Sequence, residues 1–264
     1  RIEIADGRIV VVTREPEIRL LVDPADPRLA AADLLNFDAY EEAETGMLSR
    51  LIRRGDTVLD VGANVGWHAI FLAKRVPGIT VHSFEPVPDT YHSLVEHREL
   101  NGMAEIHPHH FGFSKEAGRL SFFLPPASVN ASAANLTGRP DVRRIDVEVR
   151  RLDDFVRAEG ITPAVVKVDV EGAELHVLEG APDTLRRHRP VVFAEMLRKW
   201  AAPFGYHPNE IIRLMASHGY RCFVIRGEGL EEFLAMDDAT VDTNFFFLHG
   251  ERHAEALASV IRRR

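Results

Sequence analysis

The alternation of short apolar runs with helix-like segments constrains the fold of this chain more than any other feature. The strand-like runs span residues 57–61, 79–84, 104–108, 164–169, 190–194, 220–225 and 244–248. The helix-like segments span residues 66–75, 88–100, 173–186, 207–218 and 252–262. Strands that alternate with helices pair in parallel through right-handed crossovers. The sequence therefore predicts an α/β fold with a doubly wound, mostly parallel, seven-stranded sheet and helices on both faces.

Two further parts of the chain depart from this rhythm. Residues 1–22 alternate apolar and polar side chains around the turn sequence ADG, which predicts a β-hairpin. Residues 118–124 and 142–150 predict an additional strand pair, joined by a polar loop rich in small residues. We therefore predict an N-terminal hairpin and connector over residues 1–37. A single α/β domain over residues 38–264 follows, beginning with an amphipathic helix.

The charge and composition of the chain exclude several classes of partner. Its formal net charge of −8 argues against a protein that grips the phosphate backbone of nucleic acids. No apolar run approaches the roughly 18 residues of a membrane-spanning helix. Cys222 is the only cysteine, so no intrachain disulfide and no zinc site built on thiolates can form. We therefore expect a small-molecule partner and a reducing, cytoplasmic setting, with neither nucleic acid nor membrane.

The first strand of the alternating region leads into a glycine-containing turn, DVGANVG, and then a helix. Gly62 permits a sharp turn and close approach of a ligand, and Gly66 allows the helix to pack near the strand. Similar turns bind the phosphates of dinucleotides, but the pattern for those ligands has a second glycine where this chain has Asn64. The carboxylate of Asp60 would also repel a pyrophosphate. The turn therefore favours a cationic ligand.

Glu85 ends the second strand-like run. In a doubly wound sheet its carboxylate would lie at the carboxyl end of the strand next to the first, where it suits ribose hydroxyls. The same spacing occurs in nicotinamide enzymes, so Glu85 alone does not discriminate between the two ligand classes.

The turn over residues 60–66 resembles motif I of class I S-adenosylmethionine-dependent methyltransferases, in the variant found in the FkbM family. Residues 84–102, 149–155 and 165–181 resemble further segments of that family, and VKVDVEGAEL before VLEGA is the most specific of them. The similar segments together span roughly residues 40–200. The resemblance implies a Rossmann-like class I methyltransferase fold with S-adenosylmethionine as cofactor.

The resemblance also implies which residues contact the cofactor. Those around its methionine part would be Asp60, Gly62, Ala63, Asn64 and Gly66, with Asp169 from a later strand. Glu85 would bind the ribose hydroxyls. Those beside the adenosine would be Phe84, Pro86, Gly112, Phe113 and Ser114.

Acidic residues follow two later strand-like runs. Lys167 and Asp169 alternate along one strand, so they point to the same face, and Asp169 lies at the strand end. Glu171 follows in the turn, and Glu195 ends the next strand. We predict that Asp169, Glu171 and Glu195 converge near the transferable methyl group. Lys167 is either a catalytic group or the ion-pair partner of a neighbouring acid.

Methyl transfer to oxygen is an in-line displacement that needs an oriented acceptor and a base. Orientation accounts for up to ~7–11 kcal/mol of barrier in favourable cases, and a positioned base adds about 10²–10⁴-fold. Because an alcohol is a poor acid, a carboxylate of raised pKa or a metal ion would help. Asp169 and Glu195 supply the oxygen ligands that Mg²⁺ prefers, which makes Mg²⁺ a second candidate cofactor by analogy of fold.

Several residues also have ordinary structural interpretations. Glu174 is typical of an acid that interacts with a helix N-terminus. His68 suits a helix cap or the surface as well as a position facing the ligand. The histidines of HPHH, at positions 107, 109 and 110, are more typical of a strand near the sheet edge than of a metal site.

We therefore expect O-methylation of a hydroxyl on a sugar or polyketide-like molecule, as in natural product biosynthesis. The polar loop between residues 124 and 142 is the expected acceptor side. A nicotinamide-dependent oxidoreductase and a non-catalytic cofactor-binding domain of a larger assembly are the alternatives. Nitrogen or carbon as the methylated atom, and the oligomeric state, are left open by the sequence.

Overall fold

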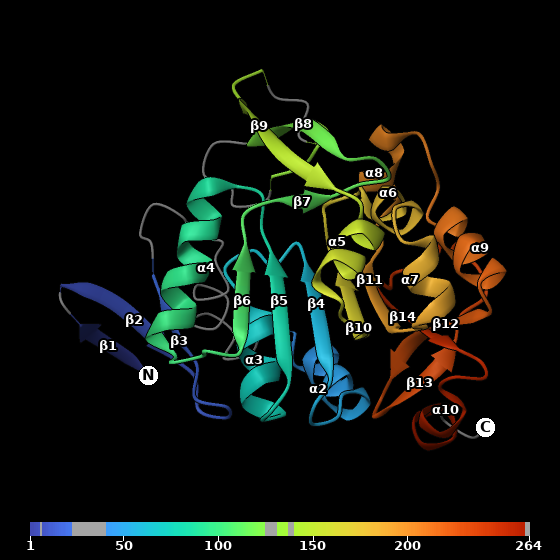
Figure 1. The fold of residues 1–264 in the computed structure, drawn as a ribbon, viewed down its shortest axis with the longest axis horizontal. Helices are drawn as coiled ribbons and strands as arrows, with labels where there is room; N and C mark the ends of the chain where they lie inside the picture. The colour runs from blue at the N-terminus through green and yellow to red at the C-terminus, as the bar shows by residue number, and fades with distance from the viewer. Residues whose placement is uncertain (6, 23–40, 125–130, 137–139, 262–264) are drawn as a thin grey trace.

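A computed structural model describes residues 1–5, 7–22, 41–124, 131–136 and 140–261. A β-sheet lies at the centre of the molecule, with helices around it (Figure 1). Its strands are β4 (Thr57–Val61), β5 (Thr80–Phe84), β6 (Ile106–His109), β10 (Pro163–Val168), β11 (Val191–Glu195), β12 (Tyr220–Arg226), β13 (Gly229–Glu232) and β14 (Asn244–His249). They lie across the sheet in the order β13-β12-β14-β11-β10-β4-β5-β6.

The strand order reverses its direction beside β4. This strand pairs in parallel with both β5 and β10, and β6 and β11 extend the parallel part on either side. The strands β14, β12 and β13 continue the sheet with antiparallel pairing. The predicted doubly wound, mostly parallel sheet is confirmed. Ligands bind such sheets at the carboxyl ends of the strands where the order reverses, which here are β4 and β10.

The predicted number of strands is wrong by one. Each predicted run forms a strand, but β13 adds an eighth as an antiparallel edge strand on β12. Its sequence, GLEE, carries no apolar run, and only Leu230 among its residues is buried. An edge strand with a single buried side chain leaves too weak a periodic signal to predict.

The helices also match the sequence pattern, except that one predicted helix is broken and two short helices were not predicted. Their bounds are α2 (Glu42–Leu51), α3 (Trp67–Arg75), α4 (Pro88–Leu100), α5 (Leu152–Glu159), α6 (Glu174–Glu179), α7 (Pro182–Arg187), α8 (Arg198–Ala201), α9 (Asn209–Ser217) and α10 (Ala254–Val260). The helix predicted over residues 173–186 is broken in two, because Pro182 cannot continue a helix from the preceding turn and starts a new one. The short helices α5 and α8 were not predicted.

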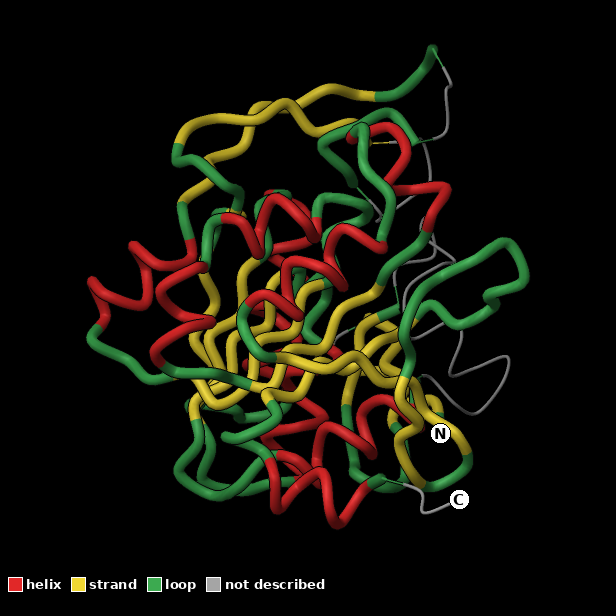
Figure 2. The backbone as a smooth tube through the Cα atoms, turned by 90° about the vertical axis from the view of Figure 1, so that its right-hand side faces the viewer, coloured by secondary structure: helices red, strands yellow, loops and turns green. Residues whose placement is uncertain are grey.

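Alternate residues of the central strands fill two apolar layers. Val58, Val165 and Phe193 face α2 and α3 on one side of the sheet. Leu59 and Val166, one residue further along, face α5 and α6 on the other side. Figure 2 shows helical segments on both sides of the strands. Within the described residues no helix has both the length and the apolar character needed to cross a bilayer.

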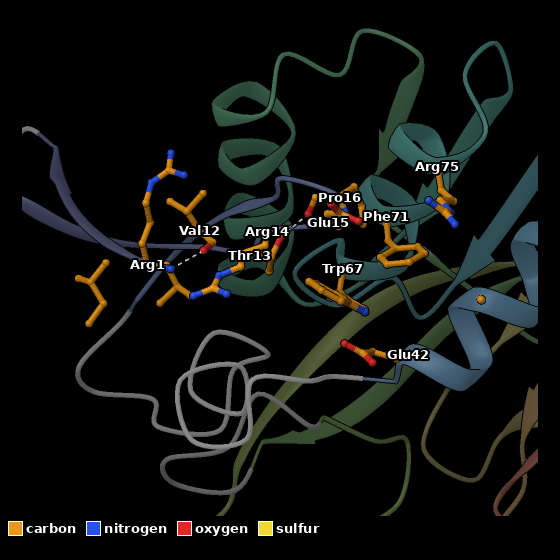
Figure 3. Close-up of a pocket in the computed structure, with 13 residues that line it drawn as sticks. Arg1, Val12, Thr13, Arg14, Glu15, Pro16, Glu42, Trp67, Phe71 and Arg75 are labelled. Carbon is orange, nitrogen blue, oxygen red and sulfur yellow. Dashed lines mark hydrogen bonds between the residues drawn. The ribbon is translucent and has the colours of Figure 1, made fainter.

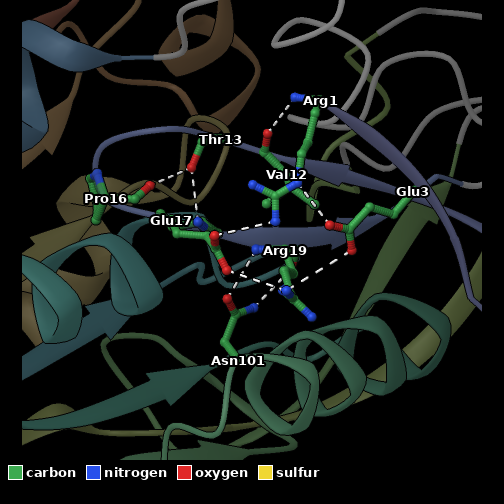
Figure 4. Close-up of polar contacts among 9 residues, drawn as sticks. Arg1, Glu3, Val12, Thr13, Pro16, Glu17, Arg19 and Asn101 are labelled. Atoms are coloured by element: carbon green, nitrogen blue, oxygen red, sulfur yellow. Dashed lines mark hydrogen bonds and ion pairs between the residues drawn. The ribbon is translucent and has the colours of Figure 1, made fainter.

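The N-terminal strands form a small antiparallel sheet against α4. The predicted hairpin is present as β1 (Ile2–Ala5) and β2 (Arg8–Val12), and β3 (Arg19–Leu21) adds a third strand. Asn101 of α4 accepts a hydrogen bond from the Arg19 amide and donates one to its carbonyl (Figure 4). Val11 and Leu20 belong to the same apolar layer as α3. The domain boundary at residue 37 stays a prediction, since residues 23–40 lie outside the described part.

A second small sheet lies beyond the carboxyl ends of the central strands (Figure 1). It consists of β7 (Gly112–Phe113), β9 (Arg143–Arg150) and β8 (Gly118–Leu124), in that order. The additional strand pair predicted from the sequence is therefore confirmed. Of the expected acceptor-side loop, residues 125–130 and 137–139 are outside the described residues, and the segment 131–136 returns to pair with β8 at Phe123.

Candidate active site

A cavity of about 310 Å³ lies at the reversal point of the sheet. Its walls come from the ends of β4, β5 and β10, from the small sheet, and from the 3₁₀ turn η1 (Ala202–Phe204). The predicted cofactor contacts that line it are Gly62, Asn64, Glu85, Pro86, Gly112, Phe113, Ser114 and Asp169. The structure thus brings residues from four predicted segments around one space.

The turn after β4 is held to the end of β5. The amides of Gly62 and Ala63 both donate to the Phe84 carbonyl, at 3.1 and 3.0 Å. The Asn64 amide donates to Glu85 Oε2 at 3.0 Å. Asn64 has a φ of 49°, in the left-handed region that asparagine tolerates better than most residues. It therefore fits this turn without the second glycine of the dinucleotide pattern.

Neither glycine of this turn could carry a side chain, because other parts of the protein lie where its Cβ would be. A Cβ on Gly62 would lie 1.7 Å from the Asp169 carbonyl oxygen. A Cβ on Gly66 would lie 2.5 Å from Leu94 Cδ1 on α4. The predicted sharp turn at Gly62 is present, with a φ of 76°, and Gly62 also lets the end of β10 approach. Gly66 lets α4 pack against the turn, where the sequence predicted packing of a helix near the strand.

Glu85 is a buried acceptor with capacity left for a ligand. Its Oε1 accepts a hydrogen bond from the Val87 amide at 2.9 Å, while Oε2 accepts the one from Asn64. Burial raises the pKa of Glu85 to about 7, although both hydrogen bonds oppose the rise. Since a carboxylate has about four acceptor sites, two remain for hydroxyl donors.

Asp60 and Phe84 do not line the cavity, in contrast to their predicted contacts with the cofactor. The Asp60 side chain is 1% exposed and its Oδ1 lies 3.1 Å from Lys167 Nζ. Phe84 is fully buried, with its ring against those of His109 and Phe113. Alternation along the strands places Asp60 on the same face of the sheet as Lys167 and places Phe84 in the apolar layer on the other face. Ala63 and Gly66 belong to the turn but are also not part of the lining.

Lys167 is saturated by three oxygen acceptors. Its Nζ donates to the Gly62 carbonyl at 3.0 Å, pairs with Asp60, and lies 3.4 Å from Asp169 Oδ2. Burial alone would lower the pKa of Lys167, but the charges of Asp60 and Asp169 raise it above its ordinary value. The ammonium therefore acts as an ion-pair partner that ties the end of β10 to the turn after β4.

The turn after β10 is closed by Glu174 and Tyr206. Glu174 Oε1 accepts hydrogen bonds from the amides of Val170 and Gly172, at 3.1 and 3.0 Å. The Tyr206 hydroxyl donates to the Gly172 carbonyl at 2.7 Å and lies 3.2 Å from Glu174 Oε2. Glu174 thus satisfies the backbone of its own turn, which is a more specific role than the predicted interaction with a helix N-terminus.

Glu171 points into the cavity from this turn, with a φ of 55°. Its carbonyl accepts a hydrogen bond from Ser132 Oγ at 2.8 Å, which fixes the backbone. Its Oε2 is buried and has no hydrogen-bond partner within the described part of the chain. Burial, followed by the charges of Asp169 and Glu174, raises the pKa of Glu171 to about 8.

The charge of Asp169 lies close enough to Glu171 and Glu195 to raise the pKa of both. Burial raises the pKa of Glu195 to about 10, and the charges of Asp169 and Glu171 and a hydrogen bond with Asp169 add to the rise. Glu195 is therefore protonated at neutral pH. It lies behind Asp169 and, unlike Asp169 and Glu171, does not line the cavity.

The residues around Asp169 and Glu195 do not fit a Mg²⁺ ion. The Lys167 ammonium is 3.4 Å from Asp169, and Glu195 holds its proton. Among the described residues no group of three or more His, Cys, Asp or Glu is arranged to hold a metal. The histidines of β6 lie at the sheet edge, as the sequence indicated, where His109 Nε2 is 3.0 Å from His82 Nδ1.

Sequence reasoning missed two kinds of residue near the site. Glu41 Oε2 lies 3.1 Å from the buried His68 Nε2, and burial raises the pKa of Glu41 to about 7, with a further rise from Asp169. His68 is therefore a buried partner of Glu41. It does not lie at the surface and does not line the cavity. The remaining cavity wall was also missed, and it comprises Val61, Lys115, Leu120, Phe122, Ala131, Ala133, Val170, Ala173, His176 and Phe204. Most of them lie in segments that the sequence analysis singled out, since Val61, Val170, Ala173 and His176 fall in segments that resemble the family and Ala131 and Ala133 in the expected acceptor-side loop.

A larger cavity of about 780 Å³ lies elsewhere, between the N-terminal strands, α2 and α3 (Figure 3). Trp67, Phe71 and Arg75, from one side of α3, line it together with Arg1 and Glu42. None of the strand-end carboxylates reaches it. The smaller cavity is therefore the candidate active site.

Comparisons with known proteins agree with this geometry. The family model described as "Methyltransferase FkbM domain" matches residues 60–222, which is more than half of the chain. Three related proteins match shorter or longer segments. "Methyltransferase 1" of Beauveria bassiana is 28% identical over 48% of this chain and 58% of its own length. "31-O-demethyl-FK506 methyltransferase FkbM" of Streptomyces tacrolimicus is 29% identical over 64% of this chain and 74% of its own length.

The third relative, "Hexuronic acid methyltransferase AglP" of Haloferax volcanii, is 33% identical over 50% of this chain and 52% of its own length. Among solved structures, a methyltransferase FkbM from Methylobacillus flagellatus KT covers 74% of this chain and 44% of its own, with 19% identity and a TM-score of 0.47. The expected class I, Rossmann-like fold is confirmed, and the chain belongs to the FkbM methyltransferase family.

Proposed function

We propose that this methyltransferase uses S-adenosylmethionine to methylate a hydroxyl oxygen of a small molecule. The observation that carries the proposal is the excess of acceptors and acids around the cavity. Glu85, Asp169 and Glu171 line it. The ammonium of Lys167, which is buried beside it, already has three oxygen partners. Such a site suits a ligand with a sulfonium, an ammonium and hydroxyl donors. It suits a pyrophosphate poorly, which counts against the nicotinamide alternative.

The residues present fit the cofactor at further points. Asn64 Oδ1 is a buried acceptor that lacks a hydrogen-bond partner within the described residues, so a donor from the cofactor would satisfy it. Glu171 Oε2 also lacks one, and we assign it to the hydroxyl of the acceptor. Glu85 would accept from the ribose hydroxyls. Pro86 and Phe113 offer apolar surface for the adenine, beside the backbone of Gly112 and Ser114.

The chemistry follows from the acids at the end of β10. When bound, S-adenosylmethionine supplies a methyl group on a positively charged sulfur. Glu171 is the carboxylate placed to take the hydroxyl proton, because its pKa of about 8 lies near the working pH. Asp169 contributes the negative charge that keeps this pKa raised, and Lys167 holds Asp169 in position. Glu195 carries a proton and supports Asp169 from behind.

The relatives support small-molecule acceptors, since two of them are named for a hexuronic acid and for FK506. The acidic character of the chain supports the same class over nucleic acid. A cytoplasmic location stays a prediction that rests on Cys222 being the only cysteine.

The proposal is tested by methyl-transfer assays with labelled cofactor on a hydroxylated acceptor found by screening sugars and polyketide alcohols. We expect Glu171→Gln to lower kcat by about 10²–10⁴-fold while leaving the affinity for S-adenosylhomocysteine unchanged. The rate should rise with pH as Glu171 loses its proton. Asp169→Asn should move this rise to lower pH, because it removes a charge that raises the pKa of Glu171.

The matched control is Glu148→Gln, which removes an exposed glutamate paired with Arg150 on the small sheet. Its rate should equal that of the wild type. Full activity of Glu171→Gln would show that this residue is not the base. A protein that binds the cofactor but transfers no methyl group to any acceptor would favour the non-catalytic alternative.

A further inference from the structure

The cavity has two chemically different halves. One half carries the turn after β4, Glu85 and Pro86, and accounts for the proposed cofactor contacts. The other half lies beside Asp169 and Glu171 and is lined by apolar side chains from four separate segments. These are Leu120 and Phe122 of β8, Ala131 and Ala133, Val170, and Phe204 of η1. The proposed cofactor contacts leave this half unassigned.

The small sheet presents an apolar face to this half of the cavity. Leu120 and Phe122 are paired in register with Val147 and Ile145 of β9, and side chains of paired residues share a face. The opposite face is mostly polar, as shown by the 2.7 Å hydrogen bond from Ser121 Oγ to Asp146 Oδ1. The alternation of β8 therefore places Leu120 and Phe122 toward the cavity, and it places Arg119, Ser121 and the remaining phenylalanine, Phe123, on the opposite face.

The described residues do not fully cover this apolar face. Leu120 lines the cavity and is 36% exposed, and Phe122 and Ile145 are half-buried. On an ordinary two-layer sheet, side chains on the inner face would be buried by a second layer. Here the space next to Leu120 and Phe122 is the cavity.

The charges around this half restrict what can fill it. Its base carries the carboxylate of Asp169, and Glu171 is anionic whenever it is ready to take a proton, so an anionic group there would be repelled. The basic residues of the lining are Lys115, which is exposed, and His176, whose ring packs edge-on against Phe204 and whose pKa is lowered by burial and then by Lys115. The wall of Leu120, Phe122 and Phe204 offers no hydrogen-bonding side chain. A free sugar, which presents hydroxyls in all directions, would leave these hydroxyls unpaired.

We propose that the acceptor is an uncharged alcohol with a sizeable apolar framework, which packs against Leu120 and Phe122 while its hydroxyl reaches Glu171. This assignment of substrate class rests on the proposed methyltransferase function. It excludes free sugars and uronic acids as preferred acceptors. A sugar remains compatible only where an apolar group is attached to it.

The test uses probes with a constant hydroxylated head and a growing apolar tail. Methyl, propyl, butyl and hexyl β-glucosides are titrated below micelle-forming concentrations into protein saturated with S-adenosylhomocysteine. We expect affinity to rise roughly two- to fourfold for each added methylene that the wall buries. Equal affinity along the series would overturn the proposal.

Two variants locate the effect. Leu120→Ser should flatten the dependence on tail length and leave the affinity for S-adenosylhomocysteine unchanged. Ile9→Ser is the matched control, because Ile9 is a similarly exposed apolar strand residue, 40% exposed, in the N-terminal sheet. It should keep the full dependence.

The remaining outcomes separate this inference from the proposed function. If Leu120→Ser keeps the dependence of affinity on tail length, the face is not an acceptor site and the proposal fails. The proposal also fails if Leu120→Ser lowers the affinity for S-adenosylhomocysteine by the same factor as the affinity for the hexyl probe. If the wild type does not bind S-adenosylhomocysteine at all, the proposed function fails first, and the inference with it. Binding of S-adenosylhomocysteine with a flat probe series would overturn only the acceptor class.

Discussion

The turns after β4 and β10 meet the same structural demand in different ways. Both contain a left-handed residue, Asn64 in the first and Glu171 in the second. Both also have backbone amides that donate to a side chain instead of to a helix or strand carbonyl. In the first turn Glu85 of the neighbouring strand satisfies an amide. In the second turn Glu174 does so from within its own helix, with Tyr206 fixing the carbonyl of Gly172.

The difference decides what each turn offers a ligand. The first turn presents backbone, Asn64 and a carboxylate that still has acceptor sites, which suits recognition of a nucleoside. The second presents the unpaired carboxylate of Glu171, which suits proton transfer. Lys167 joins the two turns by bonding to Gly62 of one and Asp169 of the other. Binding and chemistry are thus placed on separate turns at a fixed separation.

Removal of Lys167 should have the largest effect on this arrangement. Lys167→Met leaves Asp60 buried without its cation, and breaking a buried pair in this way costs about 3–5 kcal/mol. Urea unfolding followed by circular dichroism measures the loss. The double variant Lys167→Met with Asp60→Leu should recover much of it, because no charge is then left unpaired. A double variant no more stable than the single one would show that the ion pair is not what joins the turns.

Gly62→Ala should follow closely in size. The new Cβ would meet the Asp169 carbonyl at 1.7 Å, at a φ of 76°. Overpacking and left-handed strain together cost about 2–5 kcal/mol. Gly118→Ala is the control, since no atom lies within 4 Å of its added Cβ and its φ is not in the left-handed region. Similar unfolding midpoints for the two variants would contradict the close approach of β10 to the first turn.

Tyr206→Phe should have a smaller effect, confined to the second turn. It leaves the Gly172 carbonyl without its 2.7 Å hydrogen bond, at a cost of about 1–3 kcal/mol. Because the turn positions Glu171, kcat should fall while the affinity for S-adenosylhomocysteine is kept. Isothermal titration and steady-state rates on the same preparation check this split. An equal loss in both quantities would mean that the two turns are not independent.

The last expected effect is on the pH dependence of stability. The pKa of Glu171 is raised from 4.5 to about 8 by folding, so the native state binds more protons than the unfolded chain between these values. The contribution of Glu171 to stability is therefore fully present below about pH 4.5 and is lost as the pH rises toward 8. Glu171→Gln should gain stability relative to the wild type across that window, as measured by thermal unfolding. A constant difference between the two proteins from pH 5 to 9 would contradict the raised pKa.

The sequence predicted most of the first turn and only part of the second. The strands and Glu85 could be found because each is a local pattern at or next to a strand end, whereas Pro86 and the segment 112–114 were found only through the resemblance to the FkbM family. The directions of Asp60 and Phe84 could not, because they depend on which distant strand lies alongside. Asp60 faces Lys167 only because β4 and β10 pair in register.

Other parts of the site depend on contacts between segments far apart in the chain. Tyr206 lies 32 residues after Glu174, and Ser132 lies 39 residues before Glu171. Neither carries a local signal of its role. The packing of β8 over the cavity is likewise a tertiary feature, since the same alternation of apolar and polar residues would serve any two-layer sheet.

The most direct test of the central claim is isothermal titration of the purified protein with S-adenosylhomocysteine and, in parallel, with NADH. We predict micromolar binding of S-adenosylhomocysteine and no binding of NADH, because the acids at the first turn and at the end of β10 would repel a pyrophosphate. Binding of NADH without binding of S-adenosylhomocysteine would contradict the assignment of the cavity to a methyl donor.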